Sequence, residues 1–143
     1  WMDDLGFVLM TIVSNIQFLR DRGRFVLPST FLKEDDREFA KELMNYSFVN
    51  YHKFHDKVSE NLSNWDSDRL VSTDIALIVL GLAEAVRFPN IPIKVTINEF
   101  VEISKFYSTA NSKIFVNGLL DKLIQSMMAS GEIVKSGRGL IES

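Results

Sequence analysis

The sequence has 143 residues, of which 46% are hydrophobic and 24% charged, so it is long enough to bury one substantial core. It has no cysteine, which excludes disulfides, thiolate metal sites and a cysteine nucleophile and fits a reducing cytoplasm. The formal net charge of −3 is opposite to the basic balance usual in nucleic-acid-binding domains. The longest apolar run, residues 75–83, is far shorter than the roughly 20 residues that span a bilayer, so no membrane partner is expected.

The first predicted element is an amphipathic helix over residues 3–20. Its apolar residues recur at spacings of three and four, so they form one face that must pack against another element. These residues are Leu5, Val8, Leu9, Ile12, Val13, Ile16 and Leu19. Arg20, Arg22 and Arg24 follow near its end, where basic side chains compensate the helix dipole; a phosphate contact is the alternative.

A long helix is predicted from Asp35 to Leu62, with an acidic start and an apolar face. His52 and His55 lie near each other on it, but zinc needs three or four ligands and these are the only two histidines in the sequence. We therefore expect surface histidines and no metal site.

The next helix, predicted over residues 68–88, is apolar on nearly every side, as is typical of the central helix of a bundle. Gly81 lies in its interior, where glycine costs about 1 kcal/mol against alanine, so we expect close approach of another helix there. Glu84 is expected at a rim or hydrogen-bonded position. The prolines of the segment Phe88–Pro92 make it a rigid connector.

Two further helices are predicted over residues 93–106 and 111–130, joined by a small polar turn, and a flexible glycine-rich tail over residues 131–143. The inward positions expected in the first are Val95, Phe100, Val101 and Ile103. Those expected in the second are Ile114, Phe115, Leu119, Leu123, Ile124 and Met127. The whole pattern predicts an all-α bundle of about five helices.

Motifs for catalysis or cofactor binding are missing from the sequence. No glycine-rich phosphate loop, nucleophile elbow or HExxH motif occurs. Glu99 and Glu102 share one helix face, but an acid pair without a cleft has no part in acid–base chemistry, so we expect a solvent-facing or partner-facing surface. We therefore expect no enzyme and no cofactor.

Residues 92–122 carry an ordered series of identities to one known pattern. They are Pro92, Lys94, Val95, Ile97, Asn98, Glu99, Val101, Glu102, Lys105, Ser112, Phe115, Val116, Asn117, Gly118, Leu120, Asp121 and Lys122. This block resembles the signature region of the NusB family of bacterial transcription antitermination factors. Upstream, Trp65, Arg69, Leu70, Asp74 and Glu84 also hold places of the family pattern. Val79 departs from it, since the family has arginine there; the resemblance is clear over residues 36–125.

The arginine-rich helix that begins family members has no counterpart in residues 1–35, which instead resemble the middle of long NusB-like proteins. The resemblance thus implies a C-terminal portion: an incomplete helical subdomain over residues 1–64, a second over 65–130, and the tail. Apolar surface left exposed by the missing helix is expected to favour dimerisation.

The family resemblance implies a non-catalytic adaptor in the RNA polymerase antitermination complex, binding boxA RNA and the ribosomal protein NusE. Its NusE-facing residues would be Asp74, Ile93 and Glu99, and its RNA-facing residues Asn111, Lys113 and Phe115. Free N–H groups at a helix start and the charge of Lys113 suit phosphate, and Phe115 would stack a base. The alternative is that Phe115 belongs to the core.

Three further expectations concern helix packing, RNA affinity and alternative functions. Asn117 and Gly118 are expected to allow close packing against a neighbouring helix. RNA binding by this chain should be weak, because its acidic balance offers few phosphate contacts. Two other functions stay open: an RNA-binding appendage of a ribosomal-RNA cytosine methyltransferase, and a protein–protein module with no RNA role.

Overall fold

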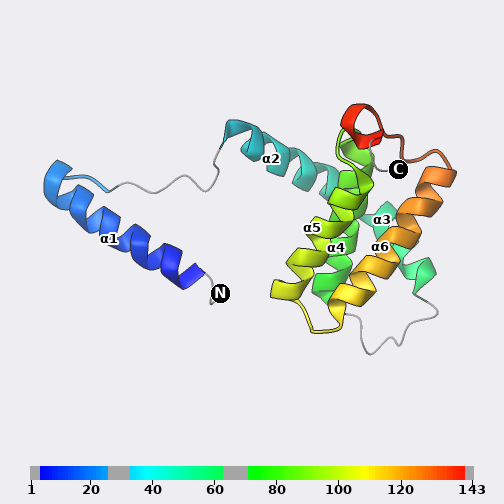
Figure 1. The fold of residues 1–143 in the computed structure, drawn as a ribbon, viewed down its shortest axis with the longest axis horizontal. Coiled ribbons are helices and arrows are strands. Elements are labelled where there is room, and N and C mark those ends of the chain that lie inside the picture. The colour runs from blue at the N-terminus through cyan, green and yellow to red at the C-terminus, as the bar shows by residue number, and fades with distance from the viewer. Residues whose placement is uncertain (1–3, 26–32, 63–70, 141–143) are drawn as a thin grey trace. The chain divides into compact units, whose positions relative to one another are not determined.

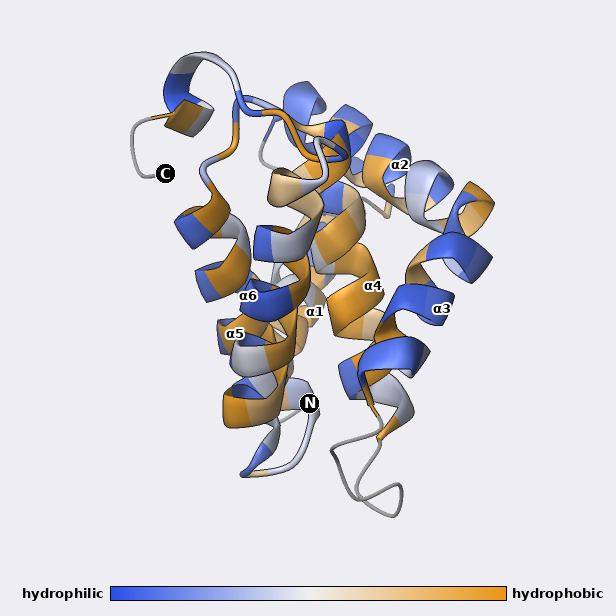
Figure 2. Cartoon of the chain, turned by 90° about the vertical axis from the view of Figure 1, so that its right-hand side faces the viewer, coloured by the Kyte–Doolittle hydropathy of each residue, from blue (hydrophilic) through white to orange (hydrophobic). Residues whose placement is uncertain are grey.

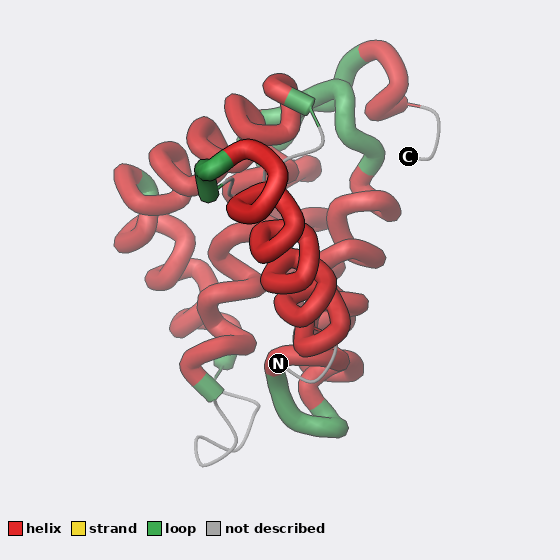
Figure 3. Tube along the Cα trace, turned by 90° about the vertical axis from the view of Figure 1, so that its left-hand side faces the viewer, coloured by secondary structure: helices red, strands yellow, loops and turns green. Residues whose placement is uncertain are grey.

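The computed structural model describes residues 4–25, 33–62 and 71–140, and these residues are helical with no strand (Figures 1 and 3). The α-helices are α1 (Asp4–Arg22), α2 (Glu34–Val49), α3 (Tyr51–Asn61), α4 (Ser72–Arg87), α5 (Ile93–Tyr107) and α6 (Ser112–Ala129). A short 3-10 turn, η2, covers Gly137–Leu140. The chain divides into two compact units, residues 1–38 and 39–143, and each is described by itself. The all-α prediction is confirmed.

Helix α1 confirms the first predicted element and makes up half of the first unit. It ends at Gly23, which has φ of 63° and whose N–H donates to the carbonyl of Leu19 at 2.9 Å. The guanidinium of Arg22 lies 5.3 Å from the ring centroid of Phe18. Its apolar side chains are exposed: Leu5, Phe7, Val8, Leu9, Met10, Ile12, Val13, Ile16 and Leu19.

The long helix predicted over residues 35–62 is two helices, because the chain turns at Asn50. That residue has φ of −102° and ψ of 12°, and its side-chain amide donates to the carbonyl of Tyr46 at 2.9 Å. The backbone N–H of Asn50 also donates to the Tyr46 carbonyl, and the Asn50 carbonyl accepts from the N–H of Phe54, so the two helices follow each other with one residue between them.

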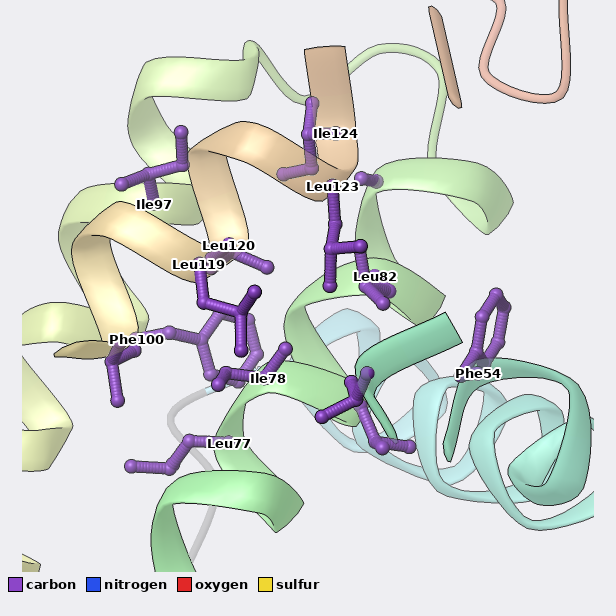
Figure 4. Close-up of a cluster of buried hydrophobic side chains, with 14 of the residues drawn as sticks. Phe54, Leu77, Ile78, Leu82, Ile97, Phe100, Leu119, Leu120, Leu123 and Ile124 are labelled. Atoms are coloured by element: carbon purple, nitrogen blue, oxygen red, sulfur yellow. The ribbon is translucent and has the colours of Figure 1, made fainter. Parts of the chain in front are cut away.

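Helix α4 lies at the centre of the second unit, packed against α3, α5 and α6. The middle of α4 is coloured hydrophobic, whereas much of α3 is hydrophilic (Figure 2). Side chains from all four helices meet in one core (Figure 4). The close approach predicted at Gly81 is confirmed: a Cβ there would lie 2.9 Å from Cδ2 of Leu120 and 3.2 Å from Phe100. Gly118 differs, because a Cβ there would meet nothing within 4 Å.

The buried face of α5 differs from the predicted one. It consists of Ile93, Thr96, Ile97, Phe100 and Ser104. This face includes two small polar residues, and it turns Val95 and Ile103 toward solvent, with 42% and 37% of their surface exposed. In α6 the predicted inward residues are buried, with the exception of Ile114, which is 65% exposed.

Residues 131–140 pack against the bundle, although the sequence predicted a flexible tail. Ile133 is 3% exposed, and the ammonium of Lys135 donates to the carbonyl of Phe88 at 3.1 Å. The N–H of Ser136 donates to the carbonyl of Pro89 at 3.0 Å. The segment is therefore held on the α4–α5 connector.

The subdomain boundary expected at residues 64 and 65 lies outside the described residues, as do Trp65, Arg69 and Leu70. Within the second unit, α3 packs on α4 and α6, so helices from both sides of that boundary share one core. In the described ranges, no helix is both long and apolar enough to cross a membrane.

Candidate functional site

Asp74, predicted to face a protein partner, is buried at the start of α4 with 2% of its surface exposed. Its carboxylate accepts hydrogen bonds from the hydroxyl of Ser108 at 2.5 Å and from that of Ser112 at 2.8 Å. The N–H of Thr109 donates to the same Ser112 oxygen at 3.1 Å. The partner-facing prediction is therefore corrected for the side chain of Asp74, because both oxygens are engaged inside the fold.

Ile93 is also buried, with 6% of its surface exposed. It is the first residue of α5, where Pro92 takes the N-cap position with φ of −61° and ψ of 144°. The side chain joins the core, so it sets the start of α5 and offers little contact area to a partner. Glu99 is different, because it is exposed on the outer face of α5.

The predicted RNA-facing residues also include both exposed and buried side chains. Asn111 is exposed at the N-cap of α6, where its side chain makes no capping hydrogen bond, and Lys113 is exposed in the first turn. Phe115 is 9% exposed and belongs to the core, so it cannot stack a base in this conformation. The reason is its position on α6, since it falls on the same helix face as the buried residues Leu119 and Leu123.

The structure brings Asp74 to a different place from the one predicted. Its partner Ser112 stands between Asn111 and Lys113 in the chain, so Asp74 supports the start of α6 and not the exposed face of Glu99. Two exposed aromatic residues escaped the sequence reading: Phe106 and Tyr107, at the end of α5, are 67% and 62% exposed. Helical periodicity could have found Phe106, because it falls opposite the face that carries Thr96 and Ser104 inward. Tyr107 falls on the buried face and is exposed at the end of the helix.

Glu84 and Lys135 are charged residues buried together beneath the connector, each with 7% of its surface exposed. Burial raises the pKa of the Glu84 carboxyl, an effect opposed by the nearby Thr96 hydroxyl and the Lys135 charge. Burial lowers the pKa of the Lys135 ammonium, opposed by Glu84. The Lys135 ammonium also donates to the Phe88 carbonyl at the C-terminal end of α4, where the helix dipole is negative. Lys135 therefore helps to hold the segment after α6 against the end of α4.

Both histidines of the sequence lie on α3. His52 and His55 lie beside Tyr51, with ring centroids 5.7 and 5.4 Å from it, and His55 Nδ1 is 3.4 Å from the Ser59 hydroxyl. In the part of the chain that the structure describes, no group of three or more His, Asp or Glu side chains could hold a metal ion. Glu102 pairs with Lys105 on the surface.

The family model of NusB matches residues 10–125, which includes both helices of the signature block and most of α1. The chain belongs to the NusB family. It is 32% identical over 138 residues to the transcription antitermination protein NusB of Salinibacter ruber, covering 94% of this chain and 86% of that protein. The match to the protein of the same name from Chloroherpeton thalassium is 34% over 106 residues, covering 74% of this chain and half of the relative's length.

A solved structure of T. maritima NusB has the same fold. Its TM-score is 0.64 at 28% sequence identity, and the likeness covers 87% of this chain and 92% of that one. The family match begins at residue 10, well before residue 36, where the resemblance in the sequence became clear. These NusB relatives are named for transcription antitermination and not for a catalysed reaction, so a methyltransferase appendage is not favoured.

Proposed function

We propose that this NusB-family chain is a non-catalytic transcription antitermination adaptor of the cytoplasm, which binds NusE and boxA RNA within the RNA polymerase antitermination complex. The observation that carries the proposal is the family match over residues 10–125, which spans both helices that hold the candidate contact residues. The structure supports separate places for the two contacts, one on the outer face of α5 and one at the start of α6.

Glu99 is the contact residue of the protein side, because it is the exposed one of the three residues carried over from the family. Ile93 acts from beneath by fixing the start of α5 in the core. Asp74 acts from beneath by holding the turn after α5 to the start of α4.

Asn111 and Lys113 are the contact residues of the RNA side. The start of α6 supplies the positive end of a helix dipole, and Lys113 adds a full charge beside it. Phe115 supports this end of α6 from the core. Because the chain has a net charge of −3 and offers few phosphate contacts, we expect weak RNA binding with a shallow salt dependence.

The test is a pair of titrations, one with purified NusE and one with a boxA RNA oligonucleotide against a scrambled RNA of equal length. We expect Lys113→Glu to weaken RNA binding and leave NusE binding unchanged, and Glu99→Lys to do the reverse. Lys122→Glu, at an exposed position further along α6, is the matched charge control.

Two results would contradict the proposal. Binding of neither NusE nor boxA RNA by the wild-type chain would remove the adaptor function as a whole. Binding of NusE with equal affinity for boxA and scrambled RNA, unaffected by Lys113→Glu, would leave a protein–protein module without the RNA role.

A further inference from the structure

Three arginines lie within five residues at the end of α1, in the first unit of the chain. Arg20 and Arg22 belong to the last turn of the helix, and Arg24 follows Gly23, where the helix has ended. All three side chains are exposed, and Asp21 is the one acidic residue among them. This cluster, which we call the α1 arginine end, is locally basic in a chain whose net charge is −3.

The helix dipole explains only part of the α1 arginine end. Basic side chains in the last turn of a helix compensate its negative pole, which accounts for Arg20 and Arg22. The effect falls off within that turn, and Arg24 lies beyond Gly23, whose φ of 63° ends the helix. The dipole therefore gives no reason for the charge of Arg24.

The charges of the α1 arginine end are largely open to a ligand. Arg20 pairs with Asp21 at 3.1 Å, but both side chains are well exposed, and an exposed ion pair is weak enough for another anion to replace it. In the part of the chain that the structure describes, no ion pair joins Arg22 or Arg24 to a carboxylate. Two guanidinium groups are thus available to an anionic partner.

Two phenylalanines accompany these guanidinium groups. The Arg22 guanidinium lies 5.3 Å from the ring centroid of Phe18, so a cation–π contact holds it in place. Phe25, which follows Arg24, has 62% of its surface exposed. Arginine binds phosphate through its fork of N–H donors, and an exposed aromatic face stacks on a base, so this combination fits a single-stranded nucleic acid.

We propose that the α1 arginine end binds single-stranded RNA, with Arg22 and Arg24 on phosphates and Phe25 stacked on a base. The inference rests on the proposed function for the kind of nucleic acid, and it adds an RNA contact in the first unit to the one at the start of α6. Phosphate contacts and base stacking are largely independent of sequence, so this end of α1 contributes affinity for any single-stranded RNA.

The distribution of charge along α1 favours RNA over a lipid surface. The apolar side chains of α1 are exposed, as in helices that lie on membranes, but such helices carry basic residues along their polar face. Residues 4–19 of α1 include no lysine or arginine, and its basic residues are confined to the last turn. A basic group at one end, beside an exposed aromatic ring, suits a few nucleotides and not a membrane plane.

The experiment measures RNA binding by fluorescence anisotropy over a series of salt concentrations, with a boxA RNA oligonucleotide and a scrambled RNA of equal length. The variant carries Arg22→Gln and Arg24→Gln together. Each lost phosphate contact reduces the salt slope of single-strand binding by about 0.7, so we expect the slope to fall by about 1.4. The loss of affinity should be equal for the two RNAs.

The matched control carries Arg37→Gln and Arg138→Gln, which remove two exposed arginine charges elsewhere in the chain and should leave the salt slope unchanged. Phe25→Ala should weaken binding of both RNAs about fivefold or more through the lost stacking. Its control is Phe48→Ala, because Phe48 is 84% exposed on α2. Circular dichroism melting of each variant shows that it is folded.

The outcomes separate this inference from the proposed function. Wild-type RNA binding with an unchanged salt slope in the Arg22→Gln, Arg24→Gln variant would overturn the α1 arginine end and leave the proposed function standing. No RNA binding by the wild-type chain would overturn the RNA role itself, and with it this inference. An equal loss in the control variant would reduce the effect to net charge and overturn the site. Lost binding to anionic phospholipid vesicles with RNA affinity intact would assign the cluster to a lipid surface and overturn the inference.

Discussion

The hydroxyl of Ser112 donates a hydrogen bond at 2.8 Å to a carboxylate oxygen of Asp74, 38 residues earlier in the chain. Both residues are buried, each with 2% of its surface exposed, and the bond joins the first turn of α6 to the first turn of α4. Together with the bond from Ser108, it fixes the α5–α6 turn on the central helix.

This relationship predicts that Asp74→Ala destabilises the fold. Hydrogen bonds to a charged group contribute roughly 1.5–3 kcal/mol, and the variant leaves the hydroxyls of Ser108 and Ser112 without their acceptor. We expect the free energy of unfolding in urea to fall by about that amount. Asp56→Ala, at an exposed position of α3, is the control. A midpoint for Asp74→Ala equal to that of the control would show that the network adds no stability.

Gly81 in α4 and Gly118 in α6 are predicted to respond differently to alanine. Both variants gain about 1 kcal/mol of helix propensity. Gly81→Ala also forces its Cβ to within 2.9 Å of Leu120 in the packed core, which costs about 1–3 kcal/mol, whereas Gly118→Ala meets nothing within 4 Å. Urea unfolding should find Gly118→Ala more stable by about 1–3 kcal/mol, and equal stabilities would refute the close approach at Gly81.

Gly139→Ala is predicted to displace residues 136–140 from the connector. A Cβ at this position would lie 2.1 Å from the carbonyl oxygen of Pro89, and neither backbone can move aside without breaking the bond from the Ser136 N–H to that oxygen. Amide hydrogen exchange of Ser136 should become faster in the variant. The control is Gly131→Asn, because Gly131 has φ of 77° in open space and asparagine tolerates such backbone angles. Unchanged exchange in Gly139→Ala would contradict the docked segment.

The ion pairs of Glu132 predict a dependence of stability on acid. Hydrogen bonds from Lys57 and Lys53 lower the pKa of this carboxyl from 4.5 to about 2. The folded state therefore holds this proton less tightly than the unfolded state, so the stabilisation is complete above the unfolded value and is lost as pH falls toward 2. Glu132→Gln should lower Tm at pH 7. It should also remove part of the fall in Tm that occurs when the pH is lowered from 4.5 to about 2. Glu60→Gln on exposed α3 surface is the control, and an identical pH profile for both variants would contradict the prediction.

The helices themselves were predictable, because the spacing of apolar residues marks them and Phe88–Pro92 separates α4 from α5. The close approach at Gly81 was also predictable, since a glycine inside an apolar helix has an evident packing use. The turn at Asn50 was not. Nothing in the periodicity changes there, and Asn15 makes the same kind of side-chain bond, to the Thr11 carbonyl, inside the unbroken helix α1.

The faces of α5 and α6 show where hydrophobicity alone fails. Reading apolar residues as inward and polar ones as outward placed Val95 and Ile103 in the core and overlooked Thr96 and Ser104, which are fully buried. A small hydroxyl residue can be buried when it bonds within its own helix, as Ser104 does with Val101. Phe106, to which the sequence analysis assigned no position, is exposed.

The docked segment 131–140 was missed because its glycines were interpreted as a sign of a flexible chain. Gly139 instead provides room for a carbonyl oxygen, and Gly137, with φ of 54°, provides a turn. Neither use can be read from composition, because each depends on the distant connector. Family resemblance assigned Asp74 to a surface, and for Phe115 it suggested an RNA contact while the helix periodicity predicted the core; both side chains are buried.

The docked segment also bears on the order in which the chain assembles. Lys57 and Glu132 are 75 residues apart, and Lys135 and Phe88 are 47 apart, so these bonds join partners made at very different moments of synthesis. A ribosome releases α3, α4, α5 and α6 before residues 132–140, so the four-helix core can form first and these long-range bonds close afterwards. Docking of residues 132–140 should then be a separate step, in which this segment locks helices that have already packed.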